Sequence, residues 1–192
     1  MQDNGIELYR RFLDGDTGGL EELISLYKCG LLRFIYGYVK DTGLAEDILT
    51  DVFMALYYKR SFREQDGATL KTYLYTIARN KSLNLLKKQK RRKEVSLETL
   101  NENGNSEAER KAQIYLFSTT PSPELALEIS ERNKDLYKAL EQIPVAYKEV
   151  LILRYFEDMS PERIAKITKR TQKQVYNLLA RGKTALKEVL IK

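Results

Sequence analysis

Hydrophobic residues recur at spacings of three and four along most of this chain, as they do in amphipathic α-helices. We expect helices over residues 6–13, 20–38, 44–58 and 70–86, the first of them ended by Gly15-Asp16. No stretch of useful length alternates hydrophobic and polar residues as a strand would. The clearest helical stripe comprises Leu20, Leu23, Ile24, Tyr27, Leu31, Phe34, Ile35 and Tyr38. The pattern therefore predicts an all-α fold.

Turn-forming and acidic residues interrupt the helical pattern between residues 94 and 123, with Asn-Gly-Asn-Ser near the start and Pro-Ser-Pro at the end. One helical turn is expected inside this stretch, near 107–115. We therefore predict two small helical domains, 1–93 and 124–192, joined by a flexible acidic linker, 94–123. The helices expected in the second domain cover residues 124–141, 145–156, 161–168 and 172 to about 190.

The composition excludes several classes of protein. The 192 residues include no His and a single Cys, Cys29. A Ser-His-Asp triad, a His-ligated or Cys-cluster metal site and an intrachain disulfide are therefore ruled out, and we expect no cofactor. The first residues lack the basic and apolar regions of a signal peptide, and no apolar run is long enough to cross a membrane. We expect a cytoplasmic protein without membrane insertion.

The formal net charge of +6 conceals an alternation along the chain. Residues 1–58 carry a net −5 and residues 59–93 a net +10, whereas residues 94–142 return to −5 and residues 143–192 carry +6. Charge scattered over a solvated surface is the plain alternative. The alternation favours two surfaces that face polyanions, with acidic surfaces left for another partner.

A helix-turn-helix is predicted near the C-terminus. Ser160 and Pro161 are typical of the start of a short helix, and Thr171 and Gln174 form a capping box at the start of a longer one. The polar face of the second helix carries amides, which can pair with adenine, and cations, which can contact guanine and phosphate. A plain amphipathic hairpin is the alternative. The candidate DNA-contacting residues are Thr171, Gln172, Lys173, Tyr176, Asn177, Arg181 and Lys183.

Two further helices carry candidate interfaces. The helix at 44–58 shows an acidic face with Asp47, Thr50, Asp51 and Met54, which suits a basic protein partner or plain solvation. The next helix aligns an aromatic side chain with amides and cations, which suits an unpaired base and its backbone better than a solvated basic tail does. Together with the preceding loop, the candidates there are Lys59, Arg60, Phe62, Tyr73, Asn80, Asn84, Lys87 and Lys88.

These segments, in this order, resemble the sigma-70 superfamily of bacterial transcription initiation factors, in the extracytoplasmic-function (ECF) branch that keeps only the second and fourth sigma domains. The resemblance rests on the opening helix from Gly15-Asp16 to Tyr27, on Ala45 to Phe53, on Tyr73 to Asn80, and on Leu140 to Arg181. It implies a factor without catalytic activity that binds core RNA polymerase and promoter DNA. Members are commonly held inactive by an anti-sigma factor between the two domains, so we expect one here.

The resemblance also implies a role for each candidate surface. The acidic helix would dock on the clamp helices of the largest polymerase subunit, and the helix from Tyr73 with its preceding loop would capture the non-template strand at the minus-ten element. The helix-turn-helix would contact the minus-thirty-five element. Five residues differ from those that the family often or usually has: Tyr73 stands in place of Trp, Thr50-Asp51 in place of Gln-Glu, Lys169 in place of the turn Gly, and Leu178 in place of Arg.

Two other classes of function remain as alternatives. An autonomous helix-turn-helix regulator would explain the basic C-terminal half but would leave the acidic helix and the surface from Tyr73 to Lys93 without a task. An enzyme has almost no support, since the sequence contains no paired acid and base, metal cluster or Gly-rich phosphate loop.

Overall fold

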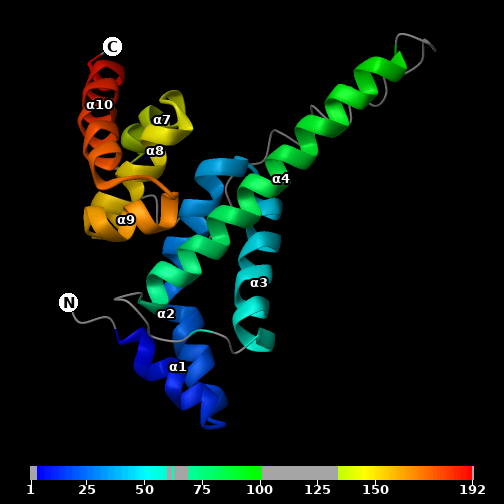
Figure 1. Ribbon diagram of the computed structural model, residues 1–192, viewed down its shortest axis with the longest axis vertical. Coiled ribbons are helices and arrows are strands. Elements are labelled where there is room, and N and C mark those ends of the chain that lie inside the picture. The colour runs from blue at the N-terminus through cyan, green and yellow to red at the C-terminus, as the bar shows by residue number, and fades with distance from the viewer. Residues whose placement is uncertain (1–3, 60–61, 63–68, 101–133, 192) are drawn as a thin grey trace.

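The computed structural model describes residues 4–59, 62, 69–100 and 134–191. Within these residues every regular element is a helix and none is a strand, which confirms the predicted all-α fold. Figure 1 shows the N-terminal helices on one side of the molecule and the C-terminal helices against their flank. The proposed helical turn near 107–115 and the predicted helix start near 124 lie outside the described residues.

Four helices form the N-terminal unit: α1 (Gly5–Leu13), α2 (Thr17–Val39), α3 (Thr42–Lys59) and α4 (Leu70–Leu100). Asp16 begins α2 by accepting a hydrogen bond from the backbone N–H of Gly18 at 2.9 Å, and Arg11 holds the Asp16 carboxylate. Asp41 caps the start of α3 through the backbone N–H of Leu44 at 2.8 Å. These hydrogen bonds satisfy backbone N–H groups that the first turn of a helix leaves unpaired.

The centre of the N-terminal unit is α2, which packs against α1, α3 and α4. Its predicted hydrophobic stripe is the core, because Leu23, Leu31, Phe34 and Ile35 have no measurable exposure. The partners on the neighbouring helices are equally buried. They are Tyr9 of α1, Ala45, Val52 and Leu56 of α3, and Leu70, Leu74 and Ala78 of α4.

Helix α4 is longer than the sequence predicts. The linker was expected from residue 94, yet the helix continues to Leu100. No Gly or Pro falls between Leu70 and Asn103, and the stretch after Lys93 holds Glu and Leu, both strong helix formers. These residues lie beyond Leu86, the last hydrophobic position of the predicted helix, so hydrophobic spacing does not predict this part of α4.

The C-terminal unit contains α7 (Lys134–Gln142), α8 (Val145–Leu151), α9 (Pro161–Thr168) and α10 (Gln172–Leu190). One turn of π-helix, η2 (Ile152–Phe156), continues α8, so the predicted helix over 145–156 is present with a widened last turn. Ser160 caps α9 with Pro161 at its first position, as predicted. Helix α10 begins at the predicted residue.

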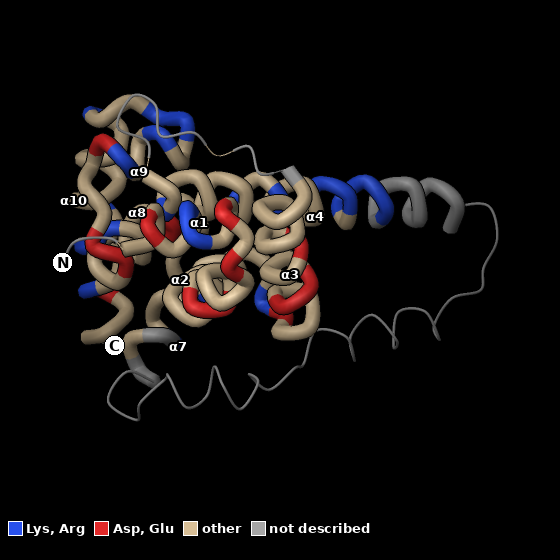
Figure 2. Tube along the Cα trace, turned by 90° about the horizontal axis from the view of Figure 1, so that it is seen from below, with Lys and Arg blue, Asp and Glu red and all other residues tan. Residues whose placement is uncertain are grey.

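The two units pack directly on each other. Helix α9 contacts α4, and α8 and η2 contact α2. Figure 2, seen from below, also places α9 and α8 beside α2 and the N-terminal part of α4. The C-terminal part of α4 projects from the body. Three charged side chains of the C-terminal unit are buried, namely Lys148, Glu149 and Glu157. The contact between the units is therefore partly polar.

This packing disfavours the protonated form of Lys148. Lys148 lies among residues such as Phe34, Tyr38 and Ile152, and its Nζ is 3.4 Å from the Gly37 carbonyl oxygen. Burial, reinforced by the nearby Lys40, lowers the pKa of Lys148 to about 8. At neutral pH folding buries the protonated amine of Lys148, which lowers the free energy of unfolding.

We predict that the free energy of unfolding rises as the pH increases from 8 toward 10. The folded pKa lies below the ordinary value of 10.5, so the unfolded chain binds more protons in this range and stability increases with pH. Lys148→Met should remove this dependence and stabilise the protein at pH 7 by about 1–3 kcal/mol. Urea unfolding of both proteins across the pH range measures the difference; parallel pH profiles would contradict the assignment.

Candidate nucleic-acid and polymerase interfaces

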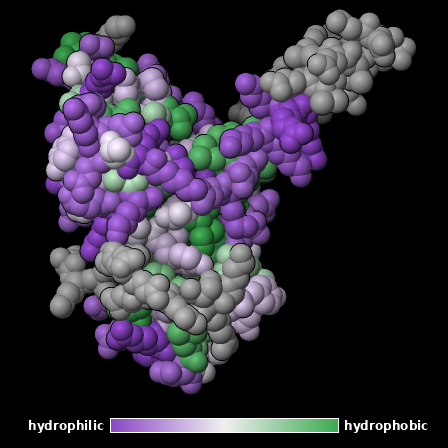
Figure 3. Space-filling view, in the orientation of Figure 1, coloured by the Kyte–Doolittle hydropathy of each residue, from purple (hydrophilic) through white to green (hydrophobic). Residues whose placement is uncertain are grey.

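The side chains predicted to meet an unpaired strand lie along one face of α4. Tyr73 and Asn80 are half-buried, and Asn84, Lys87 and Lys88 are exposed. Their spacings of seven, four, three and one place them on neighbouring turns of one helix face. The face runs outward from the body along α4, where Figure 2 shows Lys and Arg in blue and Figure 3 shows hydrophilic residues before the grey end of the helix.

Phe62 lies elsewhere than predicted. The sequence places it in the loop as a base-contacting aromatic, whereas its side chain is only 8% exposed. Its ring packs against Tyr73 at 5.4 Å and against Tyr9 at 6.0 Å between ring centroids. Burying a large aromatic ring releases more free energy than leaving it in the loop. The Phe62 ring therefore packs behind the Tyr73 ring. Arg60, its neighbour in the predicted loop, lies outside the described residues.

The helix-turn-helix has the predicted local structure. The hydroxyl of Thr171 accepts from the backbone N–H of Gln174 at 3.2 Å, and the Gln174 side chain accepts from the backbone N–H of Thr171 at 2.9 Å. The capping box is therefore confirmed. Val175 and Leu179 are buried on the inner face of α10. The seven candidate residues are all exposed: Thr171, Gln172, Lys173, Tyr176, Asn177, Arg181 and Lys183.

The turn between α9 and α10 has Lys169 where the family usually has Gly. The backbone of Lys169 is left-handed, with φ 55° and ψ 44°. The next residue then donates its backbone N–H to the Ala165 carbonyl oxygen at 3.1 Å. A side chain at such a position is tolerated at the cost of steric strain between Cβ and the backbone.

The acidic face of α3 is exposed as predicted. Asp47, Thr50, Asp51 and Met54 all lie on the surface, and Met54 is 43% exposed. Asp51 forms an ion pair with Lys81 of α4 at 2.8 Å, with both side chains open to solvent. Such an exposed pair contributes little to stability and leaves the carboxylate available to a partner.

Sequence reasoning missed the continuation of this face. Tyr58 is 72% exposed and lies one turn beyond Met54, and the ring of Tyr57 packs against it at 5.3 Å between centroids. The signal was present, because residue 58 is eleven positions after Asp47 and therefore on the same side of the helix. The α3 face thus changes from acidic to aromatic along its length.

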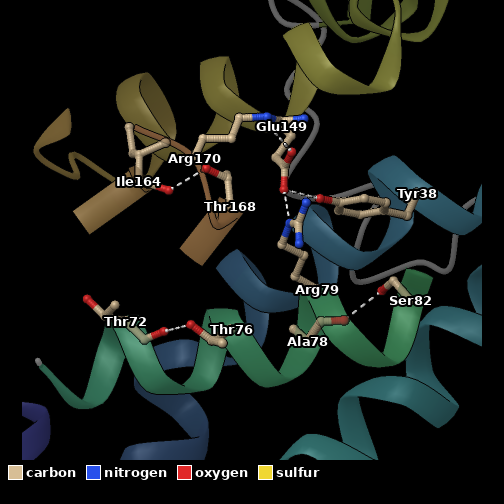
Figure 4. Close-up of polar contacts among 10 residues, drawn as sticks. All are labelled: Tyr38, Thr72, Thr76, Ala78, Arg79, Ser82, Glu149, Ile164, Thr168 and Arg170. Carbon is tan, nitrogen blue, oxygen red and sulfur yellow. Dashed lines mark hydrogen bonds and ion pairs between the residues drawn. The ribbon is translucent and has the colours of Figure 1, made fainter. Parts of the chain in front are cut away.

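Sequence reasoning also missed a buried polar cluster between the two units. The Glu149 carboxylate on α8 accepts hydrogen bonds from the Tyr38 hydroxyl on α2 and the Arg79 guanidinium on α4 (Figure 4). Arg170, in the turn after α9, donates to its second oxygen at 2.8 Å. Burial and the Glu149 carboxylate raise the pKa of Tyr38, so the phenol remains a neutral donor. The net +10 of residues 59–93 includes Arg79, which faces this acid rather than solvent.

No group of three or more metal-ligating side chains comes together within the described ranges. A helix with the length and apolar character that a membrane crossing requires is also absent from that part of the chain.

Two protein-family models match the chain. The first, Sigma-70 region 2, matches residues 23–92, and the second, Sigma-70 region 4, matches residues 133–186. Together they cover about two thirds of the sequence in the order that the resemblance requires. The chain belongs to the sigma-70 family of RNA polymerase sigma factors, in its ECF branch. The matched residues are called here the region 2 segment, 23–92, and the region 4 segment, 133–186.

Curated relatives span nearly the whole chain. The ECF RNA polymerase sigma factor SigM of Bacillus subtilis (strain 168) is 25% identical, with 88% of this chain and 93% of the relative aligned. The RNA polymerase sigma-H factor of Pseudomonas aeruginosa is 27% identical, with 98% and 95% aligned. The alignments therefore include both segments and the residues between them.

Solved structures share the fold. A sigma factor RpoE in complex with the anti-sigma factor NepR from Bartonella quintana superposes with a TM-score of 0.66 at 23% identity, covering 88% of this chain and 95% of the other. CnrH in complex with the cytosolic domain of CnrY gives a TM-score of 0.62 at 15% identity, covering 98% and 97%. At these identities the likeness concerns the arrangement of the helices alone.

We predict that Lys169→Gly stabilises this sigma factor by about 1 kcal/mol, because Gly adopts the left-handed backbone without steric strain. Lys169→Ala is the matched control, since it removes the same side chain but keeps Cβ. Urea unfolding monitored by helicity should give Gly the higher midpoint. Equal midpoints for the two variants would show that the turn carries no strain.

Proposed function

We propose that the chain binds bacterial core RNA polymerase through α3 and directs it to promoters whose two elements are contacted by α4 and α10. The observation that carries the proposal is the exposure, in one chain, of two separate faces suited to nucleic acid and one acidic-to-aromatic face suited to a protein. Core enzyme would supply the chemistry, and this factor would have no catalytic activity of its own.

The minus-ten element would meet the face of α4. Tyr73 would stack on a base of the non-template strand, Asn80 and Asn84 would hydrogen-bond to bases, and the cations farther along would hold the phosphates. Phe62 would position Tyr73 without touching DNA. The residues proposed for direct contact are Lys59, Arg60, Tyr73, Asn80, Asn84, Lys87 and Lys88.

The minus-thirty-five element would meet the N-terminal half of α10 in the major groove. Gln172 and Asn177 can make paired hydrogen bonds to adenine, and Arg181 to guanine or phosphate. Thr171, Lys173, Tyr176 and Lys183 would complete the contact with the backbone. Leu178, where the family often has Arg, is half-buried against the core and adds no base contact.

Core polymerase would dock on the exposed stripe of α3. Asp47 and Asp51 would pair with basic side chains of the partner, whereas Met54 and Tyr58 would supply apolar area. Charge pairs at such an interface set the orientation and the rate of association, and buried aromatics supply most of the affinity.

Three further expectations complete the proposal. The sigma-2-like domain would span residues 1–93 and the sigma-4-like domain residues 124–192, with 94–123 passing through the polymerase as a linker. The protein would act in the cytoplasm, where the polymerase is. An anti-sigma factor would be a further partner, as it is of the sigma factor RpoE from Bartonella quintana.

The proposal is tested by transcription from fragmented genomic DNA with bacterial core polymerase, with and without the purified chain. We expect specific run-off transcripts only when the chain is present. An autonomous regulator would instead bind a duplex operator tightly without core enzyme. Equal transcripts with core enzyme alone would overturn the sigma assignment.

We predict that Asp47→Lys with Asp51→Lys weakens binding to core polymerase by about a hundredfold or more, because like charges would then oppose each other across the interface. Glu21→Lys with Glu188→Lys is the matched control, since it changes the net charge equally at exposed sites elsewhere. Binding is measured by fluorescence anisotropy, and helicity verifies the fold. An equal loss for both variants would contradict docking through α3.

A further inference from the structure

Helix α1 precedes the residues that the family models match. The region 2 segment starts at residue 23, whereas α1 spans Gly5–Leu13. Its inner face is nevertheless part of the core, because Tyr9 is 1% exposed and Phe12 is 3% exposed. The helix packs beside α2 (Figure 1) and also contacts α4, the helix proposed to bind the minus-ten element. A role for α1 must therefore come from its contacts in this chain.

A glycine in the first turn of α2 determines how closely α1 approaches. A Cβ on Gly19 would come within 2.7 Å of the Leu8 carbonyl oxygen and 3.0 Å of the Phe12 backbone nitrogen. Both are backbone atoms of α1, so neither can move aside without displacing that helix. Gly destabilises a helix relative to Ala, and here it permits the close approach of two backbones. Helix α1 is therefore held tightly against α2.

Three aromatic rings lead from α1 to the residue proposed to stack on a base. The Tyr9 ring meets the Phe62 ring edge to face, with 6.0 Å between the centroids and 74° between the planes. Phe62 in turn packs against Tyr73 of α4 at 5.4 Å and 48°. Tyr9 and Phe62 are buried, whereas Tyr73 is half-buried. These three residues are called here the ring row, with Tyr9 as its inner and Tyr73 as its outer member.

The ring row restricts the orientation of Tyr73 before DNA arrives. Aromatic pairs favour edge-to-face or offset geometries, so the position of each ring constrains the next one. A base stacks better on a ring whose orientation is already fixed, because ordering a side chain on binding costs free energy. Phe62 lies between the two tyrosines, so its support of Tyr73 depends on the ring of Tyr9 behind it.

We propose that Tyr9 is a positioning residue for strand capture: through Phe62 it holds Tyr73 in the orientation that accepts an unpaired base of the promoter. The inference rests on the proposed function for the base, whereas the constraint on residue 73 is measurable in the free chain. Helix α1 thereby acts on the minus-ten contact without touching DNA. If the ring row were ordinary core packing, loss of the Tyr9 ring would lower stability and nothing else.

The constraint is tested with a fluorescent reporter at position 73. The chain contains no Trp, so Tyr73→Trp introduces a single one, whose local motion is measured by time-resolved fluorescence anisotropy. Tyr9→Leu should increase the fast local motion of the reporter, and Tyr9→Phe, which keeps the ring, should not. Phe53→Leu is the matched control, because it removes a buried ring of α3 outside the ring row. Equal mobility in the Tyr9→Leu and Phe53→Leu proteins, both with native helicity, would overturn the proposal.

A second pair of variants displaces α1 and leaves every ring in place. Gly19→Ala would drive a methyl group against the α1 backbone and should also loosen the reporter at position 73. Gly43→Ala is the control, since Gly43 also lies in the first turn of a helix but its Cβ would meet the Asp41 carboxylate at 3.5 Å, an ordinary contact. A reporter that is equally immobile in both folded variants would contradict the role of α1. If Gly19→Ala does not fold, the Tyr9 variants decide.

Strand opening measures the consequence, on a promoter found by the run-off assay. With core polymerase at equal occupancy by the factor, permanganate oxidation of unpaired thymines should fall roughly fivefold to tenfold for Tyr9→Leu and recover for Tyr9→Phe. Phe53→Leu should open the promoter as the wild type does, and equal opening by Tyr9→Leu and Phe53→Leu would overturn the proposal. Normal opening with Tyr73→Ala would instead reject the proposed function of Tyr73, on which the reporter measurement, made without polymerase, does not depend.

Discussion

Burying the carboxylate of Glu149 constrains the relative position of the two halves of the molecule. A charged group removed from water must be surrounded by donors, and here they come from three separate parts of the chain. Arg170 fixes the turn that starts α10, whereas Tyr38 and Arg79 fix α2 and α4. One side chain therefore sets the orientation of the helix-turn-helix relative to the helix that carries the proposed minus-ten contacts.

The rest of the contact is built around this constraint. Phe34 and Tyr38 lie on the side of α2 that meets the C-terminal helices, and their rings pack edge to face at 5.4 Å. Lys148 is buried beside them at an energetic cost, which shows that the contact is not optimised for stability alone. A polar contact of this kind is specific in geometry but modest in net free energy.

Local features of the fold were predictable because their causes lie within a few residues. The Thr171 capping box, the Ser160 cap and the stripe of α2 are each determined by nearby side chains, and the structure has all three. Phe62 and Glu149 were not predictable in the same way. In the sequence one is an aromatic in a polar loop and the other a charge on a short helix, and only contacts with residues distant in the chain, at Tyr9 and Arg79, explain their burial.

The same limit applies to the net charge of residues 59–93. Its net +10 counts every cation between residues 59 and 93, but Lys71 and Arg79 face acids of the region 4 segment. The cations farther along α4 are exposed: Lys87, Lys88, Lys90, Arg91 and Arg92. The charge that α4 offers to DNA in this arrangement is therefore smaller by these two cations than the net charge of residues 59–93. Because each neutralised phosphate releases counterions, the exposed cations set the electrostatic part of the proposed contact with DNA.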